Sequence, residues 1–216
     1  MNKKMLKKNV IASLLLVSSM SVYANNNQDE KMYFSAGISN IEVDLGIPST
    51  SAYTVDDSDT APVVMVGYKL DDNFALEAGM IGSAEASITT TANLNGTLYG
   101  NTLVINSGSK IIANANESWL FGGSYRNKLT DNFEISARGG LMFWDVDYKV
   151  DATVTYAGVQ YSANEIILSE DGSDLYLGFG ADYSLTKNLA IETSYISTEL
   201  HGSDVSALNL GIKHKF

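Results

Sequence analysis

Apolar and polar residues alternate over the last nine residues of the chain, Leu208-Asn-Leu-Gly-Ile-Lys-His-Lys-Phe216. The even positions are apolar or aromatic, and the odd positions are small, polar or charged. Successive side chains of a β-strand point to opposite faces, so this period of two predicts a strand between an apolar and a polar environment. A soluble domain rarely ends on an unprotected aromatic strand, and the pattern indicates lipid on one side and a polar interior on the other.

The same alternation recurs in seven earlier segments, which brings the number of predicted membrane-spanning strands to eight. The segments lie at residues 32–38, 64–70, 74–80, 119–125, 133–143, 175–183 and 189–195. Many glycines and tyrosines and only two prolines suit long strands. A secreted β-sandwich would also alternate, and it is the alternative at this point.

A repeated short turn distinguishes between the two architectures. Three segments each close a strand with a tyrosine, make a tight polar turn ending in Asn73, Asn132 or Asn188, and open the next strand with Phe or Leu. Asparagine tolerates the left-handed backbone conformations that short hairpins use. A sandwich has no reason to repeat an aromatic residue at every short turn. In a membrane barrel these aromatics form an interfacial girdle; they are Tyr68, Phe74, Tyr125, Phe133, Tyr183 and Phe216.

The spacing of the turns predicts the topology. Successive turns are far more than two strands of about 10 residues apart, so long connections must stand outside the membrane at the opposite end. Three short turns and two free ends give four hairpins. The fold class predicted is all-β: a single eight-stranded antiparallel transmembrane up-and-down β-barrel with short turns at one end and long loops at the other.

The first 24 residues have the pattern of a secretory signal peptide. A basic segment, Met1–Lys8, precedes an apolar, serine-containing stretch, and Val22-Tyr23-Ala24 places small residues at the −3 and −1 positions of a cleavage site. A retained membrane anchor is the alternative. The predicted organisation is therefore a signal peptide at 1–24 and a barrel domain at 25–216.

Composition excludes several classes of function. Loss of the signal peptide leaves 10 basic residues against 25 acidic ones, and this acidic balance argues against a nucleic-acid partner. The absence of cysteine excludes disulfides and thiolate metal sites, and two histidines are too few for a His-rich metal site. No cofactor and no metal are expected.

The signal peptide, the eight strands, turns of the form Asp-Asn-Phe-Ala-Leu-Glu and the terminal aromatic strand together resemble the small OmpA/OmpX-type outer-membrane barrels. The lone-barrel size and long middle loops also resemble, more loosely, the accessory colonisation factor group. The resemblance implies a monomer in the outer membrane, turns facing the periplasm and loops facing outward. It also implies lipid, lipopolysaccharide, periplasmic chaperones and the barrel-assembly machinery as partners, with Phe216 as the assembly signal. The periplasmic peptidoglycan-binding domain of full-length OmpA has no counterpart in this sequence.

The residues on the polar face of the alternating strands supply the candidate site. Glu77, Arg138, Glu192 and Lys213 fall on the lumenal side at similar distances from the turn end, so they are expected to form one network. Such a network can be a salt-bridged plug, because eight strands leave barely enough room for side chains. The alternative is a gate or ion path.

The loops carry two weaker motifs. Glu199-Leu-His201-Gly-Ser203-Asp204 contains the residue types of a serine hydrolase, but Gly-Ser-Asp is also ordinary turn chemistry. The Asp56-Asp57-Ser-Asp59 cluster has cation-ligand types without an EF-hand pattern. In contrast, segments 86–91, 102–106 and 150–156 keep the strand alternation, so the sheet is expected to continue beyond the membrane and to offer edges to a partner.

These observations predict a non-enzymatic outer-membrane barrel that acts through its surface loops, in adhesion, contact with a host or matrix ligand, or envelope integrity. A narrow pore or small hydrophobic-ligand conduit is the first alternative. A lipid A-modifying enzyme is the second.

Overall fold

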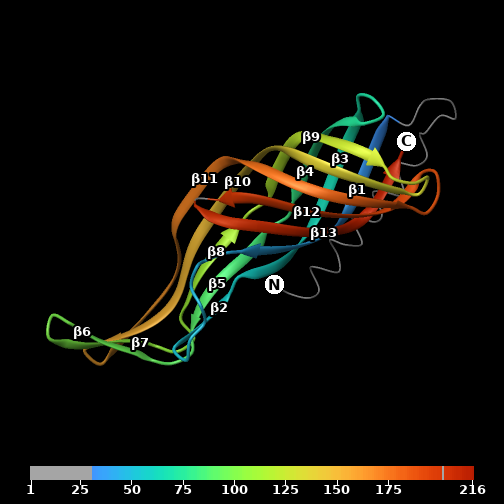
Figure 1. Ribbon diagram of the computed structural model, residues 1–216. Helices are drawn as coiled ribbons and strands as arrows, with labels where there is room; N and C mark the ends of the chain where they lie inside the picture. Colours follow the sequence, from blue (N-terminus) through green and yellow to red (C-terminus); the bar gives the residue numbers. More distant parts are fainter. Residues whose placement is uncertain (1–30, 201) are drawn as a thin grey trace.

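The computed structural model describes residues 31–200 and 202–216, and it consists of strands joined by turns and loops. Eight strands form a closed antiparallel ring, in the order in which they follow along the chain (Figure 1). They are β1 (Met32–Val43), β3 (Ser58–Lys69), β4 (Phe74–Ile81), β9 (Ser118–Lys128), β10 (Phe133–Tyr156), β11 (Val159–Ser184), β12 (Leu189–Leu200) and β13 (Ser203–Lys215). The prediction of eight barrel strands is confirmed. No helix within the described residues is long and apolar enough to cross a membrane.

The first and last strands close the ring. β13 pairs with β1 over eleven residue pairs, from Tyr33 opposite Lys215 to Val43 opposite Val205. β1 pairs with β3 on its other side, beginning with Met32 opposite Tyr68. Closure removes the free edges that an open sheet of this length would expose.

Side chains in the ring follow the alternation read from the sequence. The lipid-facing set is exposed, with Leu177 and Phe179 each 69% exposed, whereas the residues between them point inward. A belt of exposed aromatics lies at the turn end, where Phe74 and Tyr125 on adjacent strands stack edge to face with centroids 5.2 Å apart. The exposed apolar residues thus form the outer wall, and the alternate residues line the lumen.

The three short turns lie where the sequence placed them, but their chemistry differs from the expectation. None of Asn73, Asn132 and Asn188 has a positive φ. Side-chain oxygens close the turns instead, and Asp71 Oδ1, for example, accepts hydrogen bonds from the backbone N–H groups of Asn73 and Phe74. The asparagine side-chain amide donates a hydrogen bond to a neighbouring strand: Asn73 Nδ2 lies 2.8 Å from the carbonyl oxygen of Arg126.

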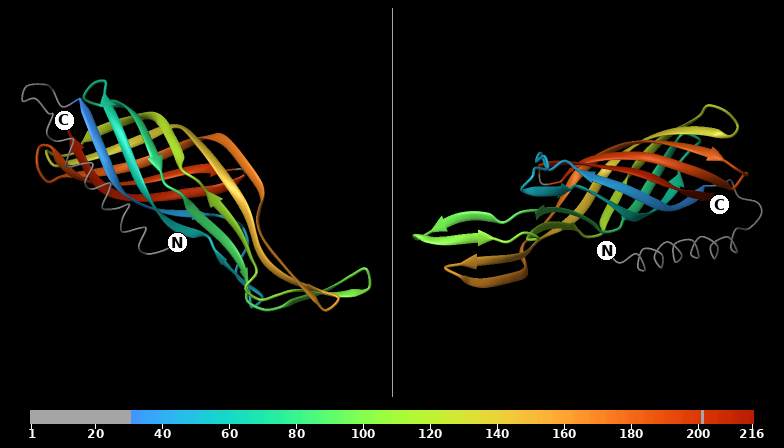
Figure 2. Two further views of the ribbon diagram at one scale, coloured as in Figure 1. Left: turned by 180° about the vertical axis from the view of Figure 1, so that it is seen from behind. Right: turned by 90° about the horizontal axis from the view of Figure 1, so that it is seen from below.

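The long loops are themselves largely strands, as the alternating segments indicated. The sheet extends beside the loop-end half of β10 through three further strands, in the order β2-β5-β8-β10-β11. They are β2 (Tyr53–Asp56), β5 (Ala84–Thr90) and β8 (Lys110–Ala115). β6 (Leu94–Leu98) and β7 (Asn101–Ile105) form a hairpin that pairs with the tip of β10. Figure 2 shows this hairpin and that of β10 and β11 projecting well beyond the ring.

Two turns at the tips explain why these hairpins stay continuous. Tyr99-Gly100 and Ala157-Gly158 each have two successive positive φ values, 48° and 78° in the first and 49° and 80° in the second. Two such residues match the right-handed twist of the flanking strands, so β10 and β11 pair up to their tips.

The predicted signal peptide, residues 1–24, lies outside the described residues, as does His201.

Candidate functional site

Arg126 lies at the centre of a charged layer in the turn-end half of the lumen. Its guanidinium contacts three carboxylates: Glu77 at 2.9 Å, Glu134 at 2.9 Å and Asp182 at 3.2 Å. It also donates to the hydroxyl of Tyr33 at 2.8 Å and lies 4.3 Å from the centre of that ring. Tyr33 donates its own hydroxyl hydrogen to Glu77.

The four residues singled out in the sequence lie in the same layer. Arg138 contacts Glu192 at 2.7 Å and Glu77 at 3.7 Å, and Lys213 contacts Glu192 at 3.2 Å. Lys213 also lies 2.5 Å from Asp182, which joins it to Arg126 through a shared carboxylate. We call the seven residues the charged layer: Glu77, Arg126, Glu134, Arg138, Asp182, Glu192 and Lys213.

Sequence reasoning missed the central residue of the layer, although the signal was present. Tyr125 was placed on the lipid side, and the alternation then puts Arg126 inside the barrel. The segment from Tyr125 had been taken as the start of a turn, whereas β9 continues to Lys128 and pairs it with Glu134. Glu134 was also missed, although it lies in the predicted strand 133–143, where the alternation places it inside the barrel.

The buried charges balance, and their pairing leaves little room for a path. The buried charged residues among those described are four acidic and four basic: the seven of the charged layer and Lys215. Lys213 is fully buried and lies 5.0 Å from the centre of the Tyr33 ring, which Arg126 also contacts at 4.3 Å. Buried charges are stable only when paired in this way, and the pairing fixes the side chains across the lumen.

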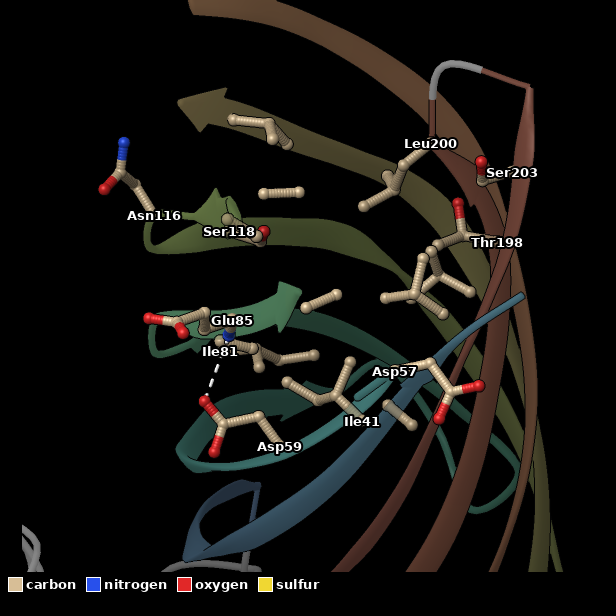
Figure 3. Close-up of a pocket in the computed structure, with 18 of the residues that line it drawn as sticks. Ile41, Asp57, Asp59, Ile81, Glu85, Asn116, Ser118, Thr198, Leu200 and Ser203 are labelled. Atoms are coloured by element: carbon tan, nitrogen blue, oxygen red, sulfur yellow. Dashed lines mark hydrogen bonds between the residues drawn. The ribbon is translucent and has the colours of Figure 1, made fainter. Parts of the chain in front are cut away.

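The loop-end half of the lumen is apolar. Leu120, Tyr176 and Ile196 are at most 2% exposed and pack with Met142, Val63 and Ile81 above the charged layer. Beyond them a cavity of about 100 Å³ opens at the loop end, lined mainly by aliphatic side chains and alanines (Figure 3). The lumen therefore has two layers, one charged at the turn end and one apolar at the loop end.

The two loop motifs differ in how much of them the structure describes. Asp59 accepts backbone hydrogen bonds from Thr60 at 2.7 Å and Glu85 at 3.0 Å, which holds β3 to the start of β5. Within residues 31–200 and 202–216 no three His, Asp or Glu side chains are placed to hold one metal ion. Ser203 begins β13 and lines the cavity, but His201, the base of the suggested hydrolase motif, lies outside the described residues.

Comparison with known families agrees with this architecture. The family model described as outer membrane protein beta-barrel domain matches residues 10–216. The chain belongs to this family. It is thus an outer-membrane protein, as the sequence predicted, and its relatives are barrel proteins rather than typical enzymes. No curated protein matches the sequence.

Two solved outer-membrane barrels share the fold. OprG of Pseudomonas aeruginosa has a TM-score of 0.54 at 14% identity, over 86% of this chain and 95% of its own. Ail, the attachment invasion locus protein of Yersinia pestis, crystallised with the heparin analogue sucrose octasulfate, has a TM-score of 0.52 at 12% identity, over 86% of this chain and 98% of its own. At these identities the likeness concerns the fold alone.

Proposed function

We propose that this barrel is a surface binding protein that takes up an extended segment of a host or matrix protein at its loop end. The observation that carries the proposal is the open edge of β11. Residues 176–184 of β11 pair with β12, whereas residues 159–175 pair only with β10 and leave their other side without a strand among the described residues.

The open edge has the features of a strand-addition site. Ile166 and Leu168 are 57% and 49% exposed there, and Ile167 forms a bulge between them. Residues 159–175 contain neither lysine nor proline, two of the residues that blunt natural edges, so the protection of this edge is limited to the bulge and to acidic side chains. Backbone groups on such an edge bind an extended peptide, while alternate side-chain contacts select its sequence.

Charge restricts the partner. In the four loop segments 44–60, 82–117, 143–175 and 199–204, Lys110 and Lys149 are the only Lys or Arg residues, against 15 Asp and Glu. A sulfated sugar such as the one bound by Ail would be repelled by this surface. A neutral or basic polypeptide segment fits it best.

The lumen argues against the pore or conduit considered from the sequence. Either one needs a continuous path, and the charged layer lies across it with Arg126, Lys213 and their carboxylates all buried.

Charged substitutions on the β11 edge test the proposal. Ile166→Lys and Leu168→Lys should each reduce adhesion of expressing cells to immobilised laminin, fibronectin or collagen by about tenfold for whichever protein the wild type binds, because an edge lysine opposes strand addition. Tyr99→Lys is the matched control: Tyr99 is 90% exposed at the tip of the β6–β7 hairpin, and the variant adds the same charge away from the edge. Adhesion unaffected by the edge variants, or wild-type cells that adhere to none of the three, would reject strand addition to a matrix protein.

We further propose that Phe216 is an assembly signal read by the barrel-assembly machinery after delivery by periplasmic chaperones. Its backbone N–H donates to the carbonyl of Met32 at 2.8 Å, and its ring stacks on His214 at 4.5 Å, so it lies at the seam that closes the barrel. Deleting Phe216 should lower the amount of heat-modifiable barrel in the outer membrane, whereas Phe216→Tyr should not. Equal amounts of folded barrel at native expression in the deletion would contradict this role.

A further inference from the structure

The cavity at the loop end is an apolar site, open toward the loops, that neither strand addition nor barrel assembly uses. Ile41, Ile81 and Ile196 come from ring strands, and Ala113 and Ala115 come from β8 outside the ring. Figure 3 shows side chains from opposite walls converging on the cavity, with Leu200, Thr198 and Ser203 on one side and Ile81 and Ser118 on the other.

The floor of the cavity is closed. Leu120, Tyr176 and Ile196 seal it from below, and the charged layer follows. The volume of about 100 Å³ is comparable to engineered cavities of about 150 Å³ that stay dry and bind benzene. An apolar cavity offers water few hydrogen-bond partners, so a small apolar molecule is its favoured occupant.

Carboxylates lie at the rim of the cavity, where Asp57 and Glu85 are exposed and Asp59 is half-buried. Hydroxyls of Ser118, Thr198 and Ser203 also line it, and those of Ser118 and Thr198 belong to buried residues. In Figure 3 the side chains of Asp57 and Glu85 point away from the cavity, while the backbone N–H of Glu85 donates to Asp59. A carboxylate on a ligand would meet like charges at this rim, whereas an amine or a hydroxyl would meet acceptors.

We propose that this cavity binds a small molecule with an apolar body of about six carbons and a neutral or cationic polar group, taken up from the loop end. The molecule is held in the mouth of the barrel and does not cross it, because the charged layer closes the lumen beneath. The site is separate from the β11 edge, so it stands or fails independently of partner binding there.

The test uses three probes that share one tail: 1-hexanol, hexylamine and hexanoate. Each is titrated into the purified barrel in amphipol, and binding is followed by saturation-transfer difference NMR. Hexanol and hexylamine should bind at least about tenfold more tightly than hexanoate. Absence of saturable hexanol or hexylamine binding would overturn the proposal that the cavity binds small apolar molecules. Hexanoate binding as tight as that of the other two would overturn the proposal that the acidic rim disfavours a carboxylate.

Cavity-filling variants connect binding to this cavity. Ala207→Phe places an aromatic ring in the cavity from β13 and should weaken hexanol binding at least about tenfold, whereas Leu208→Phe, on the lipid face next to it, should leave binding unchanged. Ala115→Phe fills the cavity from β8, which lies outside the ring. This variant therefore changes no residue of the ring strands and does not test whether they accept a larger side chain. Unchanged hexanol binding in a folded Ala207→Phe or Ala115→Phe protein would overturn the proposal.

Discussion

Arg126→Ala is expected to lower the free energy of unfolding of the barrel by about 3–5 kcal/mol, the cost of leaving buried charges without their partner. The substitution removes the arginine that pairs with Glu134 and takes the central cation away from Glu77 and Asp182, which keep Arg138 and Lys213 respectively. It also removes one of the two cations on the Tyr33 ring. Arg138→Ala should lower the free energy of unfolding less. In that variant Glu77 keeps the nearby Arg126 at 2.9 Å, and Glu192 keeps Lys213. Urea unfolding followed by tryptophan fluorescence, together with heat-modified gel mobility, measures the difference.

Two further variants separate the charge effect from general damage. Lys128→Ala removes an exposed cation two residues further along β9 and should leave stability within about 0.5 kcal/mol of wild type. Adding Glu134→Gln to Arg126→Ala should recover part of the loss, because the carboxylate that has lost its arginine is then neutral. Equal stability of Arg126→Ala and Lys128→Ala would contradict the account of the charged layer.

Gly67→Val is expected to disrupt the same layer without removing any charge. A Cβ at Gly67 would lie 1.9 Å from Cζ of Tyr33, so the ring must move and its hydroxyl must leave Arg126 and Glu77. Overpacking of this kind costs about 1–3 kcal/mol, to which the lost contacts of Tyr33 add. The same urea titration measures it.

Ala78→Val is the matched control for Gly67→Val. Ala78 is exposed on the lipid face of β4, directly opposite Val66, and added bulk there meets no lumenal side chain. Gly67→Val combined with Tyr33→Ala should be less harmful than the sum of the two changes, since the clash has gone. A Gly67→Val barrel as stable as Ala78→Val would show that Tyr33 is free to move away without loss.

The period of two was enough to predict the ring, because each strand lies between lipid and a polar lumen and one misplaced residue would reverse both faces. The same rule placed Glu77, Arg138, Glu192 and Lys213 together. It did not place Arg126, because the end of β9 was judged from turn residues, and strand pairing carries that strand further. The tips of the β6–β7 and β10–β11 hairpins were also only partly foreseen, since Tyr99 and Ala157 are poor residues for positive φ and give no turn signal.

The apolar cavity could not be read from the sequence at all. Its lining comes from strands of the ring and from β5 and β8, and only the pairing of β8 with β10 brings Ala115 next to the mouth of the barrel. Alanines spaced along a polar loop carry no pattern that indicates an apolar cavity. Contacts that depend on how loops fold over the ring need the structure.

Single-channel recording in planar bilayers tests most directly whether the lumen is closed, which is the central claim. The wild-type barrel should show no steady ion conductance, and Arg126→Ala should show small openings as water and ions enter the broken charged layer. A wild-type barrel that conducts steadily, with a conductance unchanged by Arg126→Ala, would contradict the closed lumen and favour a pore.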